Sequence, residues 1–417
     1  MKEKRNFLLA LTAIFGLAIA GCGGGDSGGK EGNKGGSTDG GGKTLVGRDL
    51  PTEAGNTAEG DTIKIGMIAS LNGEQQPWGV DCQKGGQLAV EEFNAAGGLN
   101  GKKVELIVED TNSKPEQGKT ATEKLVGADK VLAVVGEVAS GITLPAAKVC
   151  QEVGVPLVAV GATRVDVTQQ GGAIFRACFT DDFQGAAMAK FAFEELKLKN
   201  VAILTDKKLP YSTGLSDVFR KAFESMGGTI VAEEFYESGN IDFKPQLANI
   251  KGKNPDGLFC SGYFTEVGPI ARQKKDVGLN VPMFGGDGWD STQLLASGGD
   301  GIIGGFFANH YHNSEDRPEV HAFVDNFKKK FGAEPATAMG ALGYDATKLV
   351  LEALTRASSA DSKALLTEIA NTKGFKGVSG TFDIGPDGNA EKPILVLKVE
   401  KTGFVPVKQI PFFRFEK

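Results

Sequence analysis

Apolar and polar residues along the chain follow the alternation of strands and helices that is typical of parallel-sheet domains. From residue 62 a short apolar segment, IKIGMIA, precedes an amphipathic segment that closes with glycines, GVDCQKGGQLAVEEFNAAGG. The first segment predicts a strand and the second a helix, and this unit then recurs. The first series of predicted elements is strand 63–69, helix 79–98, strand 103–110, helix 114–128, strand 131–136, helix 140–153 and strand 156–160.

A second series of the same kind begins at residue 182. Its predicted elements are helix 182–198, strand 201–206, helix 213–226, strand 229–235, a helix after residue 242, strand 257–262, helix 265–277 and strand 282–286. Strands that are continuously apolar and separated by helices indicate a parallel sheet covered on both faces. The sequence therefore predicts an α/β fold with two doubly wound parallel-sheet domains that face a cleft.

The C-terminal part of the chain has too few strands for a third domain of this type. Its predicted elements are helices near 319–331 and 338–357 and strands near 380–384 and 394–401. We therefore expect this part to return and complete the first two domains. The predicted lobes are residues 62–181 plus 313–388 and residues 182–312 plus 389–417, with three hinge crossings near 180–182, 310–313 and 388–392.

The N-terminus has the pattern of a secretory signal. Three basic side chains within residues 1–5 precede an uncharged apolar run, 7–20, which is too short to remain as a membrane-spanning helix. The segment Ile19-Ala20-Gly21-Cys22 then resembles the lipobox of bacterial lipoproteins. That resemblance implies that residues 1–21 are removed, that Cys22 is acylated, and that the lipid anchors the protein in the cell envelope on the periplasmic or extracellular side.

Residues 22–61 are rich in Gly, Ser, Thr, Asn and Asp and have few apolar side chains, which predicts a flexible tether. After residue 63 no apolar run is long enough to cross a bilayer. The net charge of −6 argues against nucleic acid as a partner. The chain after the tether is longer than one core usually serves, which agrees with two domains.

Four cysteines follow the tether: Cys82, Cys150, Cys178 and Cys260. Their wide and irregular spacing includes no C-x-x-C, so it indicates neither a zinc ribbon nor a redox pair. An exported protein can form disulfides, and burial as small apolar residues explains the cysteines equally well. The sequence leaves any pairing open.

Candidate binding residues follow the predicted strand ends, where open parallel sheets bind their ligands. They are Trp78, Ser140 and Thr163 in the first domain, and Tyr211, Tyr263 and Asp287 in the second. Ser140 begins a helix where Ser is a favoured N-cap, so its hydroxyl and the nearby free N–H groups could receive an anion. Each residue also has a structural interpretation, as a helix cap, a packed ring or a turn residue. Their shared place at strand ends favours binding.

From residue 62 onward the chain resembles the leucine/isoleucine/valine-binding proteins, type I periplasmic binding proteins that supply ABC importers. The segments that carry this resemblance, in the order of the family, are QPWG, NAAGG, GVPLVAVGAT, DFQGAAMAKF, YSTGL, SGYFTE, RQKKDVGL and GYDAT. The resemblance implies an amino-acid ligand, branched-chain or related, and a membrane permease as partner. We expect the protein itself to be a monomer.

The resemblance also implies a role for each candidate residue. Ser140 and Thr163 would hold the α-carboxylate of the ligand. The main-chain carbonyl of Gly161, the hydroxyl of Thr163 and the carboxylate of Asp287 would hold its α-ammonium. Three aromatic side chains would close over the ligand: Trp78, Tyr211 and Tyr263. A zwitterion taken out of water needs donors for its carboxylate and an anion for its ammonium, and these residues would supply both.

Two departures from the family leave the preferred side chain of the ligand open. Asp287 stands where relatives carry glutamate, so the ammonium contact must shift or use a water. The disulfide that some relatives place beside the serine loop is missing, because Ala139 precedes Ser140. A second tryptophan near the predicted cleft, Trp289, adds to this question.

The sequence does not indicate an enzyme. It contains no G-x-S-x-G elbow between a predicted strand and a predicted helix, no H-E-x-x-H and no dinucleotide-binding fingerprint, and we expect no cofactor. His310 and His312 could present two imidazoles to a metal, but no further ligand follows at a suitable spacing, so we interpret them as polar residues at a strand end. Two alternatives to transport remain: a ligand sensor that presents its closed form to a membrane receptor, and a binder of a small amide or carboxylate.

Overall fold

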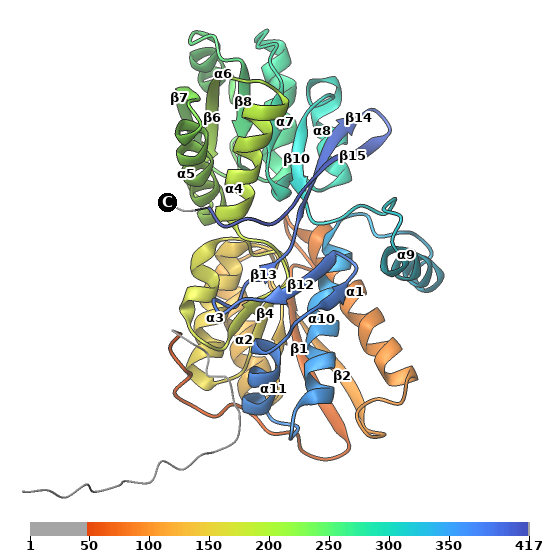
Figure 1. The fold of residues 1–417 in the computed structure, drawn as a ribbon. Coiled ribbons are helices and arrows are strands. Elements are labelled where there is room, and N and C mark those ends of the chain that lie inside the picture. Colours follow the sequence, from red (N-terminus) through yellow and green to blue (C-terminus); the bar gives the residue numbers. More distant parts are fainter. Residues whose placement is uncertain (1–47, 416–417) are drawn as a thin grey trace, which may run out of the picture. The chain divides into compact units, whose positions relative to one another are not determined.

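Two β-sheets organise the residues that the computed structural model describes, 48–415 (Figure 1). The described residues are part of one compact unit, in which each sheet is the centre of a lobe. The predicted signal segment 1–21, the predicted acylation site Cys22 and the predicted tether up to residue 47 lie outside the described residues.

The N-terminal lobe is built on a five-stranded parallel sheet with the order β2-β1-β3-β4-β5. Its strands are β1 (Thr62–Ala69), β2 (Lys103–Asp110), β3 (Val134–Val135), β4 (Leu157–Ala159) and β5 (Ile174–Arg176). Its helices are α1 (Gln76–Ala95), α2 (Pro115–Gly127), α3 (Ser140–Val153), α10 (Met339–Arg356) and α11 (Ser362–Ala370). The strand order reverses at β1, so right-handed crossovers place α1 on one face of the sheet and α2 and α3 on the other.

Local sequence explains several features of these elements. Pro115 is the first residue of α2, where its missing N–H costs no helical hydrogen bond. Helix α3 ends at Gly154, which has a φ of 75°, a left-handed conformation that glycine adopts without steric cost. Strands β3 and β4 lie inside the sheet and are apolar and buried throughout, as strands covered on both faces must be.

The C-terminal lobe is built on a seven-stranded sheet with the order β15-β14-β10-β9-β8-β6-β7. Its strands are β6 (Asn200–Asp206), β7 (Thr229–Tyr236), β8 (Gly257–Cys260), β9 (Met283–Gly285), β10 (Phe306–Asn309), β14 (Ile394–Glu400) and β15 (Gly403–Ile410). Its helices are α4 (Asp181–Lys190), α5 (Pro210–Ser225), α6 (Lys244–Lys251), α7 (Phe264–Asp276) and α8 (Thr292–Gly298).

The second sheet departs from the predicted all-parallel arrangement at one edge. Strands β6 to β10 pair in parallel, but β14 pairs antiparallel with both β10 and β15. β10 leads out of the lobe into the second crossing, whereas β14 enters the lobe from the third, so the two strands run in opposite directions. The short connection between β14 and β15 makes that pair antiparallel as well, since only antiparallel neighbours can be joined by so few residues. The predicted helix 182–198 also differs: α4 ends at Lys190, and Phe191–Glu195 continues it as a wider π turn.

The chain crosses between the lobes three times, as predicted. The crossings lie between β5 and α4, between β10 and α9 (Pro318–Phe331), and between β13 (Ala390–Glu391) and β14. Helices α10 and α11 return to the first lobe, and β14 and β15 return to the second (Figure 1). A small sheet near the third crossing contains β11 (Phe375–Gly377), β12 (Gly380–Ile384) and β13. The predicted fold class is therefore confirmed.

Part of the predicted tether is held on the N-terminal lobe. The side-chain amide of Asn56 donates to the carbonyls of Val126 and Val131 at 3.0 and 2.9 Å, and Thr57 forms a β-bridge with Asp361. Residues 56 and 57, which we expected to belong to a flexible tether, are therefore held on this lobe, which corrects the prediction for this part of the segment. The lobe offers carbonyl groups at the end of α2 and before β3, and they accept hydrogen bonds from this segment.

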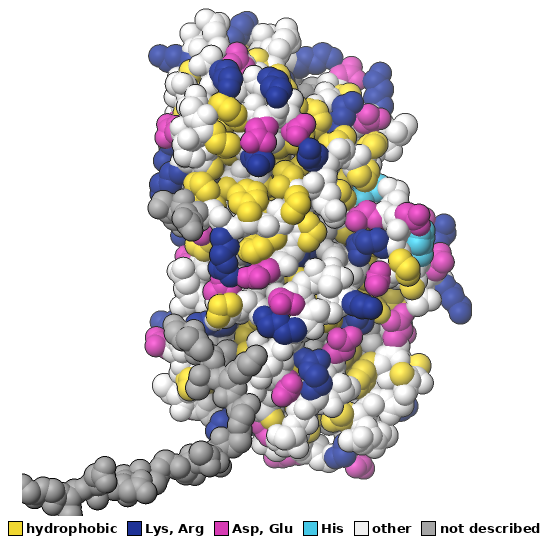
Figure 2. All heavy atoms as spheres, in the orientation of Figure 1, with side chains coloured by type: hydrophobic (Ala, Val, Ile, Leu, Met, Phe, Trp, Pro, Cys, Tyr) yellow, Lys and Arg dark blue, Asp and Glu magenta, His cyan; other side chains and the backbone are white. Residues whose placement is uncertain are grey.

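The apolar core fills both lobes, and all four cysteines that follow the predicted tether belong to it. Cys82, Cys150, Cys178 and Cys260 are buried free thiols, so burial, and not a disulfide, accounts for them. Within residues 48–415, no helix is both long enough and apolar enough to cross a bilayer. Figure 2 shows apolar side chains gathered across the middle of one face. The segment after β15 contributes Phe412 and Phe413, whose rings contact Phe183 of α4.

Candidate binding cavity

The loops at the carboxyl ends of the parallel strands in both lobes converge on one narrow cavity. It encloses about 220 Å³ between the atoms of Trp78, Val138, Ser140, Gly161, Tyr211, Tyr263, Asp287, Gly288 and Met339. Six of the seven predicted binding residues line this cavity, and Thr163 does not. The fold thus brings together residues from both lobes, and their role in binding stays a prediction.

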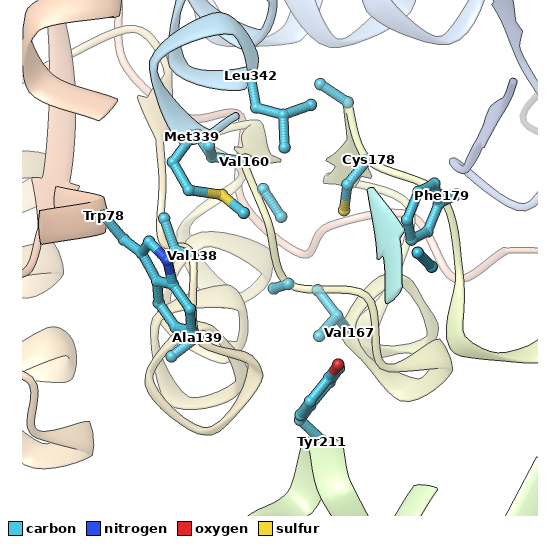
Figure 3. Close-up of a cluster of buried hydrophobic side chains, with 14 of the residues drawn as sticks. Trp78, Val138, Ala139, Val160, Val167, Cys178, Phe179, Tyr211, Met339 and Leu342 are labelled. Atoms are coloured by element: carbon cyan, nitrogen blue, oxygen red, sulfur yellow. The ribbon is translucent and has the colours of Figure 1, made fainter. Parts of the chain in front are cut away.

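Aromatic rings from the two lobes meet across the cavity. Trp78 lies in the first turn of α1 and contacts the edge of Tyr263, with ring centroids 5.0 Å apart and planes at 87°. Tyr211, in the first turn of α5, stacks on Tyr263 with centroids 5.2 Å apart. Figure 3 shows Trp78 beside Val138 and Met339 of the N-terminal lobe, with Tyr211 entering from the other lobe. This side of the cavity is apolar and aromatic.

Ser140 is the first residue of α3 and not its N-cap, which corrects the sequence-based expectation. The N-cap is Ala139, and the Ser140 hydroxyl accepts a hydrogen bond from the backbone N–H of Arg164 at 3.3 Å. No side chain caps α3; the carboxylate of Glu137 instead holds the loop before the helix, because its Oε2 accepts from the N–H groups of Val138 and Ala139 at 2.8 and 2.9 Å.

Glu137 is a buried acid that the sequence analysis missed. Its Oε1 accepts from the hydroxyls of Ser70 and Thr111 at 2.5 and 3.0 Å. Burial raises the pKa of Glu137, and these four donors oppose that shift. The pairing of β1 with β2 and β3 explains the cluster, because the ends of these strands place Ser70, Thr111 and Glu137 side by side.

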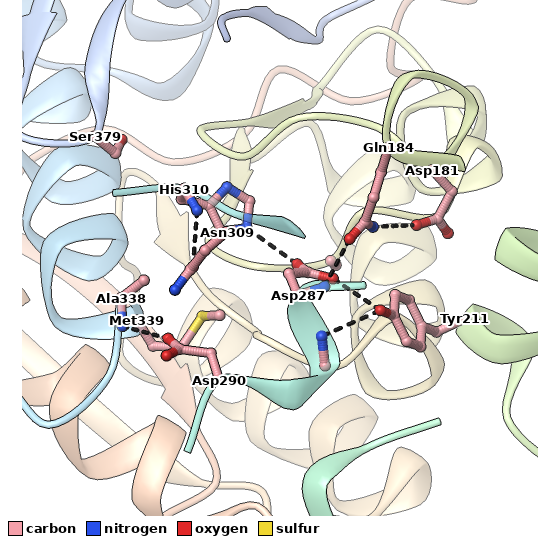
Figure 4. Close-up of polar contacts among 12 residues, drawn as sticks. Asp181, Gln184, Tyr211, Asp287, Asp290, Asn309, His310, Ala338, Met339 and Ser379 are labelled. Carbon is pink, nitrogen blue, oxygen red and sulfur yellow. Dashed lines mark hydrogen bonds and ion pairs between the residues drawn. The ribbon is translucent and has the colours of Figure 1, made fainter. Parts of the chain in front are cut away.

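Asp287 presents its carboxylate to the cavity from the C-terminal lobe (Figure 4). It follows β9 and is held at three points. Its Oδ1 accepts from the hydroxyl of Tyr211 at 2.9 Å, its Oδ2 lies 3.0 Å from Nε2 of His310, and its backbone N–H donates to Oε1 of Gln184 at 2.7 Å. These partners are neutral, so they hold the carboxylate without balancing its charge.

His310 is the second residue whose place the sequence analysis missed. We interpreted it as a polar residue at a strand end, and it does follow β10. The parallel pairing of β10 with β9 brings it beside Asp287, which follows the end of β9 by two residues. The apolar run GGFFAN before it could have indicated this strand.

The two histidines considered for a metal have different partners. His312 places Nδ1 2.7 Å from the hydroxyl of Ser314, whereas His310 contacts Asp287. In the part of the chain that the structure describes, no group of three or more His, Cys, Asp or Glu side chains is arranged to hold a metal ion.

Asp181 adds a second buried carboxyl group near Asp287. It is the first residue of α4, and its Oδ1 accepts from Nε2 of Gln184 at 3.1 Å. Burial, together with the charge of Asp287, raises the pKa of Asp181 to about 8. Each of these two buried acids disfavours the charged form of the other, so a cation on this side of the cavity would be stabilised.

Thr163 and Trp289 lie away from the cavity wall. Thr163 is buried after β4, its carbonyl accepts from the N–H of Asp181 at 2.9 Å, and no described residue forms a hydrogen bond of ordinary geometry with its hydroxyl. The indole of Trp289 donates to the carbonyl of Cys260 at 3.0 Å inside the C-terminal lobe. Trp289 therefore belongs to the core of that lobe.

Asp290 joins the two lobes beside the cavity. Its backbone carbonyl accepts from the indole N–H of Trp78 at 2.7 Å, and its Oδ2 accepts from the N–H of Ala338, the N-cap of α10, at 2.5 Å. Both donors belong to the N-terminal lobe, whereas Asp290 follows β9 of the other. These hydrogen bonds cross the cleft, so the structure represents the lobes in a closed arrangement.

Known proteins resemble this chain over most of its length. A family model described as periplasmic binding protein matches residues 62–403. The Leu/Ile/Val-binding protein BraC3 of Rhizobium johnstonii is 34% identical over 329 residues, which are 78% of this chain and 88% of that protein.

Two solved structures share the fold. A leucine binding protein, LivK from Thermotoga maritima, is 36% identical with a TM-score of 0.79, covering 84% of this chain and 99% of that one. A branched-chain amino acid transporter substrate binding protein, LivJ from Streptococcus pneumoniae in complex with isoleucine, is 32% identical with a TM-score of 0.77, covering 83% and 99%.

Proposed function

This chain belongs to the periplasmic binding protein family, and from that premise we propose that it captures a branched-chain or related amino acid for an ABC importer. The observation that carries the proposal is the cavity between the lobes, which has a helix start and a serine hydroxyl on one side and an aspartate on the other. The similarity to proteins named for leucine, isoleucine and valine supports the same ligand class.

The ligand would be held at both charged ends. Ser140 and the first N–H groups of α3 would receive the α-carboxylate, since the start of a helix favours an anion. The carbonyl of Gly161 and the carboxylate of Asp287 would receive the α-ammonium. Thr163, which does not line the cavity, would need a small shift to serve either end. A carboxylate that already has neutral partners can pair with an ammonium without losing them.

The apolar part of the ligand would lie among the aromatic rings. Trp78, Tyr263 and Met339 line the cavity with apolar atoms, and the closed arrangement keeps water from them. We expect the ligand to dock on the N-terminal lobe first and the C-terminal lobe to close afterwards. Ligand then stabilises the closed form only through the contacts that closure adds, chiefly those of Tyr211, Tyr263 and Asp287.

Asp287→Ala tests this function directly. Removing the carboxylate would leave a buried ammonium without a counter-charge, and we expect it to weaken binding by about 2 to 5 kcal/mol. Calorimetric titration of L-leucine, L-isoleucine and L-valine into the wild type and the variant measures the loss. Asp300→Ala is the matched control, because Asp300 is an exposed acid that does not line the cavity. A change of less than twofold for Asp287→Ala would contradict the proposed contact.

A thermal-shift screen of the wild type against the common amino acids and small amides and carboxylates would identify the ligand class. We expect aliphatic amino acids to raise the melting temperature most. A rise with a simple carboxylate that equals the rise with its amino acid would replace the proposal with a carboxylate binder.

We further propose that the protein is a monomeric lipoprotein anchored outside the cytoplasm through Cys22. The family supports the extracytoplasmic location, and the lipobox-like sequence supports the anchor. Cys22→Ser should release the protein from the membrane fraction, because it removes the acylated thiol. Sedimentation of the variant with membranes, as for the wild type, would exclude the lipid anchor.

A further inference from the structure

His310 connects the predicted ammonium site with the hinge. It lies just after β10, at the second crossing between the lobes, and its side chain is fully buried. The imidazole stacks on the ring of Phe179, with centroids 3.8 Å apart and planes at 17°. Phe179 lies in the first crossing, between β5 and α4. One side chain therefore contacts both a neighbouring crossing and the carboxylate that faces the cavity (Figure 4).

The contacts of the ring define which nitrogen carries the proton. A carboxylate oxygen only accepts hydrogen bonds, so Nε2 of His310 must donate to Oδ2 of Asp287 across their 3.0 Å separation. None of the residues in 48–415 bonds to Nδ1. Burial lowers the pKa of His310 to about 4, so the ring is neutral at pH 7. A neutral donor holds a carboxylate in place and leaves its charge available.

We propose that His310 is a positioning residue that holds Asp287 toward the ligand ammonium and ties this contact to the hinge. The inference rests on the proposed function and goes beyond it by assigning a role to a residue that does not line the cavity. Tyr211 fixes one oxygen of Asp287 and His310 fixes the other. The stacking on Phe179 fixes the ring itself, so Asp287 keeps its direction only while the two crossings keep their closed arrangement.

The test separates positioning from general structural support by using two probes. L-isoleucine carries the ammonium, and 3-methylpentanoate is the same molecule without it. His310→Leu should lower the affinity for L-isoleucine about tenfold or more, because a hydrogen bond to a charged group is lost. The affinity for 3-methylpentanoate should change less than threefold. His310→Gln, which keeps a neutral donor, should recover most of the affinity for L-isoleucine.

A double variant provides a second, independent measurement. If His310 acts through Asp287, then adding His310→Leu to Asp287→Asn should reduce the affinity for L-isoleucine by less than twofold further. An equal loss for both probes, or full additivity in the double variant, would overturn the inference. Failure of the wild type to bind L-isoleucine or any other amino acid would instead contradict the proposed function.

The wild-type ring can also be examined without any variant. Long-range ¹⁵N–¹H spectra of the protein at pH 7 should show His310 as the neutral tautomer with the proton on Nε2. A ring with the proton on Nδ1, or a doubly protonated ring, would exclude the proposed donor.

Discussion

Asp181 and Asp287 are two buried carboxyl groups whose neighbours give them different properties. Gln184 contacts both, since its Nε2 donates to Oδ1 of Asp181 and its Oε1 accepts from the N–H of Asp287. Asp287 also receives the hydrogen bonds of Tyr211 and His310. For Asp181, burial beside a second acid outweighs the opposing effects of Thr163, Gln184 and the charge of Arg176, and raises its pKa to about 8.

This difference predicts how Asp181→Asn changes stability with pH. The pKa of Asp181 in the folded protein, about 8, lies above its ordinary value of 3.8, so the folded protein favours the protonated form. The wild type therefore loses the stabilisation that comes from the protonated Asp181 as pH rises from about 4 to about 8. Asparagine is neutral throughout and keeps an acceptor for Gln184, so the variant should be more stable than the wild type at pH 8 and similar at pH 4.

Melting temperatures recorded between pH 4 and pH 9 measure this effect. The difference in melting temperature between Asp181→Asn and the wild type should grow as pH rises from about 4 to about 8 and then level off. Asp300→Asn, a change at an exposed acid, should show no such growth. A constant difference between Asp181→Asn and wild type at all pH values would mean that Asp181 is ionised in the folded protein across this range.

At the scale of elements, α1 and α10 pack with their backbones in close approach. A Cβ added to Gly343 would lie 2.4 Å from the carbonyl oxygen of Cys82, and one added to Gly85 would lie 2.0 Å from the carbonyl oxygen of Gly340. These distances are to backbone atoms, which cannot rotate away. Because α1 carries Trp78 and α10 begins beside Asp290, this crossing also positions one wall of the cavity.

Gly343→Ala should therefore destabilise the protein by about 1 to 3 kcal/mol, because the added methyl group forces the two helices apart. Urea unfolding monitored by circular dichroism measures the loss. Gly127→Ala is the matched control: it lies at the end of α2, where an added Cβ meets no atom within 4 Å. We expect the control to be neutral or slightly stabilising. Equal effects for both variants would contradict the close helix contact.

The sequence was sufficient to predict most elements because their apolar periodicity is strong. Strand 103–110 and helix 140–153 were predicted with the bounds that the structure gives, and the family and the fold class are confirmed. Short or mixed elements such as β10 and β15 were missed, since a strand of four residues or an exposed edge strand carries little pattern.

The sequence predicted a site residue only where its side chain, placed after a predicted strand, suits the charged groups of the expected ligand. Asp287 and Ser140 met that condition, and both line the cavity. Glu137 and His310 did not, because their significance comes from pairing between strands that are distant in sequence. Side-chain partners of this kind depend on register and loop geometry, which periodicity does not contain.

At the scale of the whole molecule, Asp290, which does not line the cavity, forms a hydrogen-bonded contact between the lobes. It exists only when the lobes are closed, so it should shift the equilibrium between open and closed forms toward the closed one. Closed forms that are populated before binding raise the apparent affinity for ligand.

Asp290→Ala should weaken L-isoleucine binding between about 2-fold and 30-fold, which corresponds to loss of a hydrogen bond at a helix start. The loss should appear mainly as faster dissociation in stopped-flow experiments. Asp290→Asn keeps an acceptor oxygen for Ala338 and should retain most of the affinity. An unchanged dissociation rate in Asp290→Ala would show that this contact does not influence closure.

The return of the chain to both lobes has a consequence for biogenesis. Neither lobe is complete until the C-terminal part of the chain has been synthesised, because α10 and α11 cover the first sheet and β14 and β15 extend the second. A nascent polypeptide that ends before α10 leaves one face of the first sheet without its helices and the second sheet without two edge strands, so we expect cooperative folding to wait for the C-terminal part. Under the proposed export of this chain, such a delay would keep it unfolded, and therefore able to cross the membrane, until translocation is finished.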